Sequence, residues 1–307
     1  MKTAFLFPGQ GSQKPGMVRE LYLELDQTEQ DLLETEFPGL REAVLSETAA
    51  DTDRMAAQLV YLSGLLSARL AKDQGIEPDV LAGFSLGEVA ALSFAEAFEP
   101  ADAHHLLAVR TQAMYAACDD QDGGMAAVNG LDPAAIEAAL ANFSQVWCVN
   151  YNSPKQTVIS GERSQLQTAI AELKSLGGKV IPLNVRGAFH SEFMQSAHDA
   201  LARELDSLVL HPLRYPVLSN LDAMVYPSDE SEIRSRIACQ VIQPVRFTLM
   251  VQELYRQGVR IFIETGYGKT LQGLISRILP GEDILVAGIS DRESLARFKQ
   301  KMEEFHV

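Results

Sequence analysis

Short apolar runs alternate with stretches of helical periodicity along most of the chain. The first run, residues 3–8, predicts a buried strand. The same pattern predicts strands at 79–82, 215–219, 259–263 and 284–289, and helices at 54–74, 86–98, 101–118, 229–240, 246–257, 269–279 and from 291 onward. This alternation is typical of an α/β fold in which helices cover both faces of a mostly parallel sheet. The acidic stretch 24–53 is predicted to form a mixture of helix and loop on the surface, and we assign no catalytic or binding residue to it.

One segment, residues 124–186, breaks this alternation. It predicts strands at 125–129, 146–151, 156–160 and 179–185, with helices at 132–142 and 162–176. The order β-α-β-β-α-β is the ferredoxin-like unit. We therefore predict a small domain at 124–186, inserted into a large domain of residues 1–123 plus 187–307. Residues 119–124 are the expected entry linker and Arg186-Gly187 the exit, and a substrate is expected in the cleft between the two domains.

Composition excludes several classes of partner. The 307 residues are 47% hydrophobic and 22% charged, as in a soluble globular protein, and no apolar run or signal-peptide pattern predicts membrane insertion. The net charge of −15 argues against nucleic acid and anionic membranes, so an anionic substrate needs a local basic pocket. Cys118, Cys148 and Cys239 lack metal-ligand spacing and favour a reducing cytoplasm; we expect no metal and no cofactor.

The most informative stretch is Gly83-Phe84-Ser85-Leu86-Gly87-Glu88, a G-x-S-x-G sequence between a predicted strand and a predicted helix. Such an elbow presents a serine hydroxyl at the end of a sheet. A side chain at Gly83 or Gly87 would force the strand against the helix. Ser85 and Glu88 also have the spacing of a capping box, so the alternative is a helix start without chemistry.

A nucleophilic serine needs a base, and six histidines are available. His306 lies on the tail, His211 in a turn before Pro212, and His104, His105 and His198 in predicted helices. His190 differs because it lies in a crossover loop, where the small domain returns to the large one. It is the candidate base, and the alternative is a histidine that caps or packs against the following helix.

Arg110 is the second candidate. On the predicted helix 101–118 it shares a face with the apolar side chains of Ala103, Leu107, Met114 and Ala117. A buried guanidinium stays charged and therefore needs an anion. That anion is either an internal Asp or Glu or a substrate carboxylate, which the planar guanidinium can bind through two hydrogen bonds.

The loop at residues 8–13 is the third candidate. Gly9 and Gly11 allow its backbone N–H groups to face the carboxyl end of the sheet. Such an amide, together with the amide that follows the nucleophile, would form an oxyanion hole. The alternative is a plain tight turn.

Taken together, these motifs resemble the malonyl-CoA:acyl carrier protein transacylases and the acyltransferase domains of polyketide synthases. The resemblance covers essentially the whole chain. It rests on FPGQGSQ at 7–13, GFSLGE at 83–88, Val109-Arg110, NYNSP at 150–154, GAFHS at 187–191, QVIQPVRF at 240–247 and ETGYG at 264–268. It implies a hydrolase-like α/β domain with a ferredoxin-like insert.

The resemblance also implies roles for these positions. Ser85 would carry the acyl group as an ester, and His190 would act as general base and then general acid. The backbone carbonyl of Gln240 would orient His190, and the amides of Gln10 and Leu86 would form the oxyanion hole. Arg110 would bind the malonyl carboxylate. The remaining implied substrate contacts are Gln10, Phe84, Phe189 and Asn152.

Two departures from the family pattern bear on the substrate. Phe84 stands where the family usually has histidine, and Tyr267 replaces a common proline. Phe84 removes a polar group beside the pocket, which weakens the case for the family's usual acyl preference. The Gly-Ala-Phe-His string is similar to the form in malonyl-selective enzymes, which favours malonyl.

The expected reaction is malonyl transfer from malonyl-CoA to an acyl carrier protein. The alternative within the family is hydrolysis of acyl groups from carrier proteins. An α/β-hydrolase esterase is disfavoured because its histidine comes late in the chain, and a docking module because Ser85 and His190 are both present. The resemblance implies an acidic carrier protein, which would need a local group of basic side chains on this acidic surface to dock. The candidates are Arg186, Arg246, Lys269 and Arg277. The alternative for each is an ordinary solvated surface charge.

Overall fold

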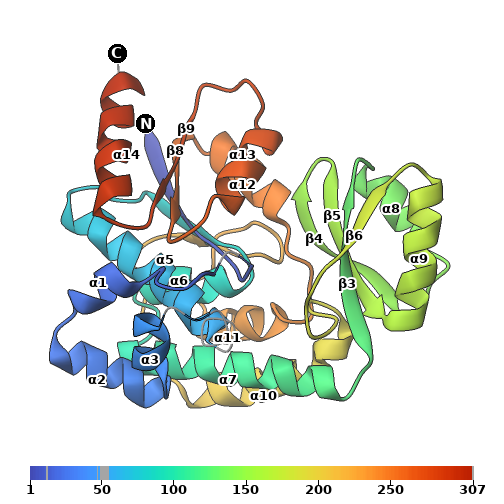
Figure 1. Ribbon diagram of the computed structural model, residues 1–307, viewed down its shortest axis with the longest axis horizontal. Coiled ribbons are helices and arrows are strands. Elements are labelled where there is room, and N and C mark those ends of the chain that lie inside the picture. The colour runs from blue at the N-terminus through green and yellow to red at the C-terminus, as the bar shows by residue number, and fades with distance from the viewer. Residues whose placement is uncertain (12, 47, 49–54, 306–307) are drawn as a thin grey trace. The chain divides into compact units, whose positions relative to one another are not determined.

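The computed structural model describes residues 1–11, 13–46, 48 and 55–305. Contacts divide the chain into two compact units. Unit 1 contains residues 1–108, 208–219 and 253–307, and unit 2 contains residues 109–207 and 220–252. Both are shown in Figure 1, and each is described by itself.

Unit 1 is built on a five-stranded parallel sheet in the order β7-β2-β1-β8-β9. The strands are β1 (Lys2–Phe7), β2 (Val80–Gly83), β7 (Val217–Leu218), β8 (Val259–Thr265) and β9 (Leu285–Ile289). Its helices are α1 (Arg19–Leu23), α2 (Gln27–Glu36), α3 (Leu40–Leu45), α5 (Ala56–Asp73), α6 (Leu86–Phe94), α13 (Thr270–Ile278) and α14 (Arg292–Phe305). The first part of α7 (Pro100–Asp119) also belongs to it.

The connections put helices on both faces of this sheet. The chain moves from β1 to β2 in one direction across the sheet and from β8 to β9 in the other. Because such crossovers are right-handed, α5 and α13 cover opposite faces. Phe5 and Phe7 of the central strand are fully buried and pack against Phe94 at the end of α6. All five strands are parallel, so their carboxyl ends meet at one edge of the sheet.

Unit 2 contains an antiparallel sheet in the order β4-β5-β3-β6. The strands are β3 (Gly123–Asn129), β4 (Val146–Ser153), β5 (Gln156–Glu162) and β6 (Lys179–Pro182). Helices α8 (Pro133–Leu140) and α9 (Arg163–Ser175) cover it, and Ile136, Ile159, Ala169 and Leu173 form the centre of its core. This strand order and connectivity are ferredoxin-like. The unit also holds the end of α7, a 3₁₀ turn at Glu192–Met194, α10 (Gln195–Ser207), α11 (Glu230–Cys239) and most of α12 (Phe247–Arg256).

The predicted elements are present, with differences at their ends. Helix α6 ends at Phe94 rather than 98, and β6 ends at Pro182 rather than 185. Gly123 and Gly124, expected in a linker, are paired residues of β3. The contact-based units group residues 109–123, 187–207 and 220–252 with the antiparallel sheet, so the domain limits at 124 and 186 stay a prediction. Within the described residues, no helix has both the length and the apolar content to span a bilayer.

Candidate active site

The turn between β2 and α6 holds Ser85 in a strained backbone conformation. Its φ of 53° lies in the left-handed region, which residues other than glycine rarely adopt. A Cβ at Gly83 would lie 2.1 Å from the amide nitrogen of Glu88, and one at Gly87 would lie 2.0 Å from the carbonyl oxygen of Phe7. Only glycine fits at either position. The sequence prediction of a G-x-S-x-G elbow is therefore confirmed in its geometry.

The helix start that the S-x-x-E spacing predicted is present, but Ser85 does not form the side-chain bond of a capping box. Ser85 occupies the N-cap position of α6, but its side chain makes no capping hydrogen bond to the first turn. The S-x-x-E spacing therefore coincides with a helix start whose serine hydroxyl does not serve the helix.

The loop after β1 lies directly against this elbow. The amide of Phe84 donates to the carbonyl of Phe7 at 2.9 Å, and a Cβ at Gly9 would lie 2.7 Å from the carbonyl oxygen of Phe84. Gly11 has a φ of 122°, and its amide donates to Oε1 of Gln13 at 2.9 Å. Unit 1 thus brings the exposed Gln10 and the buried Leu86 into neighbouring turns at the carboxyl edge of the sheet. Ser12 of the same motif lies outside the described residues.

His190 has the same unusual backbone as Ser85, with a φ of 61°. The residue is 4% exposed, and Nδ1 of its ring lies 3.0 Å from the backbone carbonyl oxygen of Gln240. A carbonyl only accepts, so Nδ1 carries the proton and Nε2 is the basic nitrogen of the neutral ring. Burial, and then the charge of Arg110, lower the pKa of His190 to about 4. The imidazole is therefore neutral at pH 7.

Arg110 is buried on α7, as its apolar neighbours predicted. Its side chain is 4% exposed, and Nη2 donates to Oε1 of Gln240 at 2.9 Å. The sequence analysis left open an internal Asp or Glu or a substrate carboxylate as its partner. At this contact a neutral amide oxygen accepts from the guanidinium. Gln240 thus touches the imidazole with its backbone and the guanidinium with its side chain.

Two further predicted residues lie in unit 2. Phe189 is half-buried and packs against Tyr115, with ring centroids 6.5 Å apart. Asn152, near the end of β4, is 9% exposed and donates through Nδ2 to Gln156 at 3.2 Å. Its Oδ1 has no hydrogen-bond partner among the described residues. Of the predicted site residues, Arg110, Asn152, Phe189, His190 and Gln240 lie in unit 2, whereas Gln10, Phe84, Ser85 and Leu86 lie in unit 1.

The other described histidines differ from His190 in their surroundings and backbone. His104 is buried against Phe37 and Tyr61, and His105 and His211 lie beside Glu36 and Glu99. His198 faces its exposed neighbour Asp199 at 2.9 Å. Only His190 among these has a left-handed backbone. His306 lies outside the described residues.

A cavity of about 460 Å³ beside His190 was not predicted from the sequence. It belongs to unit 2 and is lined by aromatic side chains of β4, by the residues that follow His190, and by the segment after Gln240. Trp147, Tyr151, Gln243 and Pro244 are among the lining residues to which the sequence analysis gave no role. Tyr151 belongs to the NYNSP block, and Gln243 and Pro244 belong to QVIQPVRF, but no sequence pattern connected these blocks to one cavity.

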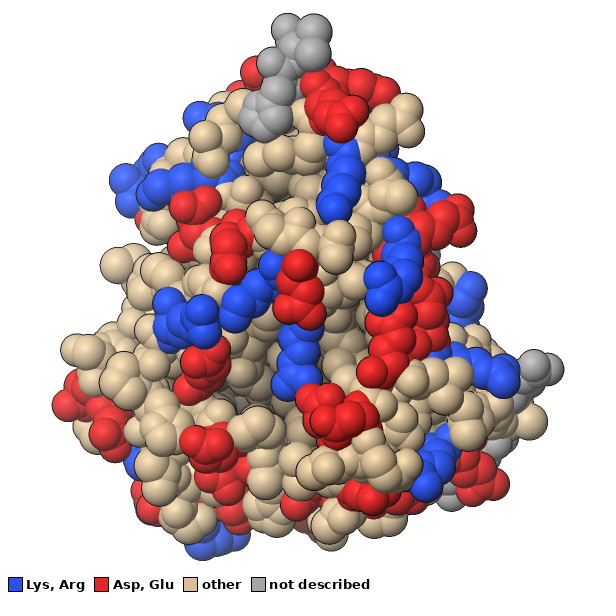
Figure 2. Space-filling view, turned by 90° about the vertical axis from the view of Figure 1, so that its left-hand side faces the viewer, with Lys and Arg blue, Asp and Glu red and all other residues tan. Residues whose placement is uncertain are grey.

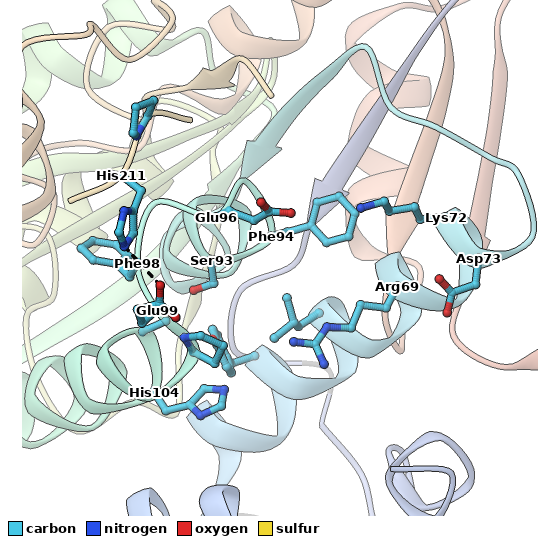
Figure 3. A pocket seen from close by; sticks show the side chains of 15 residues that line it. Arg69, Lys72, Asp73, Ser93, Phe94, Glu96, Phe98, Glu99, His104 and His211 are labelled. Carbon is cyan, nitrogen blue, oxygen red and sulfur yellow. Dashed lines mark ion pairs between the residues drawn. The ribbon is translucent and has the colours of Figure 1, made fainter. Parts of the chain in front are cut away.

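A larger cavity of about 640 Å³ lies in unit 1 at the far end of α6 from Ser85. Figure 3 shows Arg69 and Lys72 extending from α5 toward it, with Glu96 and Glu99 on the opposite wall and an ion pair between Glu99 and His211. Its cations and carboxylates are mixed, and Arg69 also pairs with Glu29. The face of the molecule drawn in Figure 2 shows a similar mixture, with basic side chains lying beside acidic ones.

Comparison with known proteins gives a consistent result. Residues 4–307 match the family described as Acyl transferase domain. A malonyl CoA-acyl carrier protein transacylase of Bacillus subtilis is 35% identical over 99% of this chain and 98% of its own length. The solved acyl-carrier-protein S-malonyltransferase of Burkholderia pseudomallei is 32% identical, with a TM-score of 0.90 over 98% of this chain and 100% of that one. A malonyl-transacylase solved in complex with a type II polyketide synthase acyl-carrier protein is 29% identical, with a TM-score of 0.87 over 98% of this chain and 100% of that one.

Proposed function

The chain belongs to the acyl transferase domain family, and we propose that it moves a malonyl group from malonyl-CoA to the phosphopantetheine thiol of an acyl carrier protein. The names of the similar proteins support both the donor and the acceptor. One observation carries the choice of a malonyl group. The buried Arg110 and the buried, neutral His190 both contact Gln240, so a permanent positive charge lies close to the candidate base, and malonyl is an acyl group that carries a carboxylate.

In the first half-reaction, Oγ of Ser85 attacks the thioester carbonyl carbon while Nε2 of His190 accepts the serine proton. The amides of Gln10 and Leu86 donate to the oxyanion, each contributing roughly 3–4 kcal/mol to lowering the barrier. The carbon–sulfur bond then breaks, and the leaving CoA sulfur takes the proton from His190. The product is a malonyl ester of Ser85. This step requires Ser85 Oγ and His190 Nε2 to come within hydrogen-bond reach.

In the second half-reaction, the carrier thiol gives its proton to His190 and attacks the ester carbonyl. The ester oxygen leaves as the Ser85 hydroxyl when His190 returns the proton. The carbonyl of Gln240 keeps the proton of His190 on Nδ1, so that Nε2 is always the nitrogen in use. The neutral resting state of the ring, set by its low pKa, suits a general base at pH 7.

Arg110 holds the malonyl carboxylate throughout, through two hydrogen bonds from its guanidinium plane. The side-chain oxygen of Gln240 accepts from one edge of that plane and orients it. We assign Gln10, Phe84, Phe189 and Asn152 to the surroundings of the acyl group, and the unpartnered Oδ1 of Asn152 is available to a donor there. Residues 124–186 would form the small domain of the enzyme. The three free cysteines fit a reducing cytoplasm as its compartment.

The alternative function, hydrolysis of acyl groups from acyl carrier proteins, is not favoured. The curated relatives cited above are transacylases, and a hydrolase of simple acyl groups has no need of a buried arginine. Intact-protein mass spectrometry tests the proposal directly. Incubation with malonyl-CoA should add one malonyl mass to the wild type and none to Ser85→Ala, and holo acyl carrier protein should remove it. Loss of malonate to water at the same rate without the carrier would contradict transfer.

A further inference from the structure

A small pocket of about 210 Å³ lies in unit 1 over the end of β9, between α13 and α14. It is notable for its charge. Its ionisable lining residues are Lys269, Arg297 and Lys301, and no carboxylate lines it. The chain as a whole carries a net charge of −15, so this concentration of cations runs against the average field of the protein. The polar remainder of the lining consists of Gln272, Ser290 and Ser294.

Two of the three cations are uncommitted. Lys269 and Lys301 form no ion pair within the part of the chain that the structure describes, whereas Arg297 pairs with the exposed Glu293 one turn earlier on α14. Asp291 is the nearby acid, and its carboxylate accepts from the amide of Ser294 at 2.7 Å. The pocket therefore offers at least two ammonium groups to an anion from solution.

The first backbone amides of α13 are not what would bind an anion in this pocket. The buried carboxylate of Glu264 already accepts from the amides of Leu271 at 3.1 Å and Gln272 at 3.2 Å. An anion in the pocket would therefore be held by the side chains of Lys269, Arg297 and Lys301. Side-chain substitution therefore tests the site.

The pocket lies along the sheet edge that carries Ser85. Ser85 follows β2, the Gln10 loop follows β1, and the pocket lies at the ends of β8 and β9. Three strand spacings separate β2 from β9, or about 14 Å. The pantetheine arm of CoA, between its sulfur and its first phosphate, is about as long as five extended residues, roughly 17 Å. Between the two ends, Nζ of Lys14 lies 4.2 Å from the ring centroid of Tyr267 and adds a further cation.

We propose that this pocket binds the phosphate groups of the CoA donor. A thioester at Ser85 with its arm along the carboxyl edge of the sheet delivers its phosphates to Lys269, Arg297 and Lys301. Phosphate is a compact anion that several ammonium and guanidinium groups bind together. The inference rests on the proposed function, since it takes malonyl-CoA as the donor, and it adds a subsite that reads the nucleotide end rather than the acyl end.

The test compares two donors of the same acyl group. Malonyl-CoA carries the phosphates, whereas malonyl-N-acetylcysteamine keeps the thioester and lacks them. Lys269→Ala and Lys301→Ala should each lower kcat/KM for malonyl-CoA about fivefold, as expected for one surface charge pair. Their kcat/KM for malonyl-N-acetylcysteamine should stay unchanged. Lys299→Ala, on the same helix but outside the pocket lining, removes the same charge and should leave both values unchanged.

Each outcome is informative. Equal losses with both donors, or no loss with either in the Lys269→Ala/Lys301→Ala double variant, would overturn the phosphate site. So would an unchanged malonyl-CoA half-reaction with a slower second half-reaction, which would assign the lysines to the carrier protein. If wild-type protein forms no malonyl ester from either donor, the proposed function fails instead. Increasing NaCl should raise KM for malonyl-CoA in the wild type and less in the double variant.

Discussion

The carbonyl oxygen of Gln240 lies 3.0 Å from Nδ1 of His190, while the side-chain amide of the same glutamine accepts from Arg110 at 2.9 Å. All three residues are at least 95% buried. One residue therefore sets the tautomer of the candidate base and the orientation of the candidate carboxylate-binding group. The two contacts use different atoms, so substitution of the side chain can alter the second while the backbone contact is kept.

Gln240→Glu should make Arg110, the proposed carboxylate-binding group, one half of an internal ion pair. The new carboxylate would stand where Oε1 now lies, 2.9 Å from Nη2 of Arg110, and would compete with the substrate. We expect kcat/KM for malonyl-CoA to fall roughly tenfold to a hundredfold, which corresponds to about 1–3 kcal/mol. Acetyl-CoA, without a carboxylate, should lose much less. A variant that loses both activities equally would show that Gln240 acts only on His190 or on folding.

Arg110→Ala should remove the carboxylate contact altogether. A desolvated carboxylate left without its partner costs roughly 3–5 kcal/mol, which is a hundredfold to several-thousandfold in kcat/KM. The loss should appear with malonyl-CoA and be far smaller with acetyl-CoA. Arg186→Ala, which removes an exposed arginine paired with Asp119 in the same unit, is the matched control. Comparable losses for the two donors would exclude a carboxylate-binding role.

The sequence predicted the local features of this site but not its long-range contacts. The burial of Arg110 followed from the apolar spacing of Ala103, Leu107 and Met114, and the elbow followed from two glycines four residues apart, since both are local patterns. The amide at Arg110 comes from a residue 130 positions later, and no periodicity links the two. The left-handed backbone of His190 and the basic pocket at β9 likewise depend on tertiary packing. Local rules identified the chemical groups, and the fold decided their partners.

The pH dependence of activity should follow the low pKa of His190. A base with a pKa of about 4 stays neutral through pH 5–8, so the rate of Ser85 acylation should be nearly flat there. An ordinary histidine would halve this rate near pH 6.5. Stopped-flow acylation with malonyl-CoA between pH 4.5 and 8 measures the profile. A midpoint near 6.5 that tracks His190 would contradict the neutral buried imidazole.

Stability should respond to acid through His104. Burial, and then the charge of Arg69, lower its pKa to about 4, while the unfolded chain binds a proton near pH 6.5. Between these values the unfolded state holds more protons, so the free energy of unfolding falls as pH falls, by up to about 3 kcal/mol from this group. His104→Phe keeps a ring against Phe37 and Tyr61 and should lose less stability between pH 7 and 4.5. Urea unfolding at both pH values measures the difference. An identical acid response in wild type and variant would exclude His104 as its source.

Gly83→Ala should destroy the elbow that presents Ser85. The added Cβ would lie 2.1 Å from both the amide nitrogen of Glu88 and the carbonyl carbon of Gly87, so β2 and α6 must separate by more than a side chain can absorb. We expect loss of Ser85 acylation and several kcal/mol of destabilisation, as for overpacking against backbone.

Gly273→Ala is the control, because a Cβ there meets nothing within 4 Å and the residue lies inside α13. It should keep full acylation and gain up to about 1 kcal/mol, since alanine favours a helix over glycine. Thermal unfolding and malonyl labelling of both variants measure the contrast. An active, stable Gly83→Ala protein would contradict the close approach of strand and helix on which the candidate nucleophile depends.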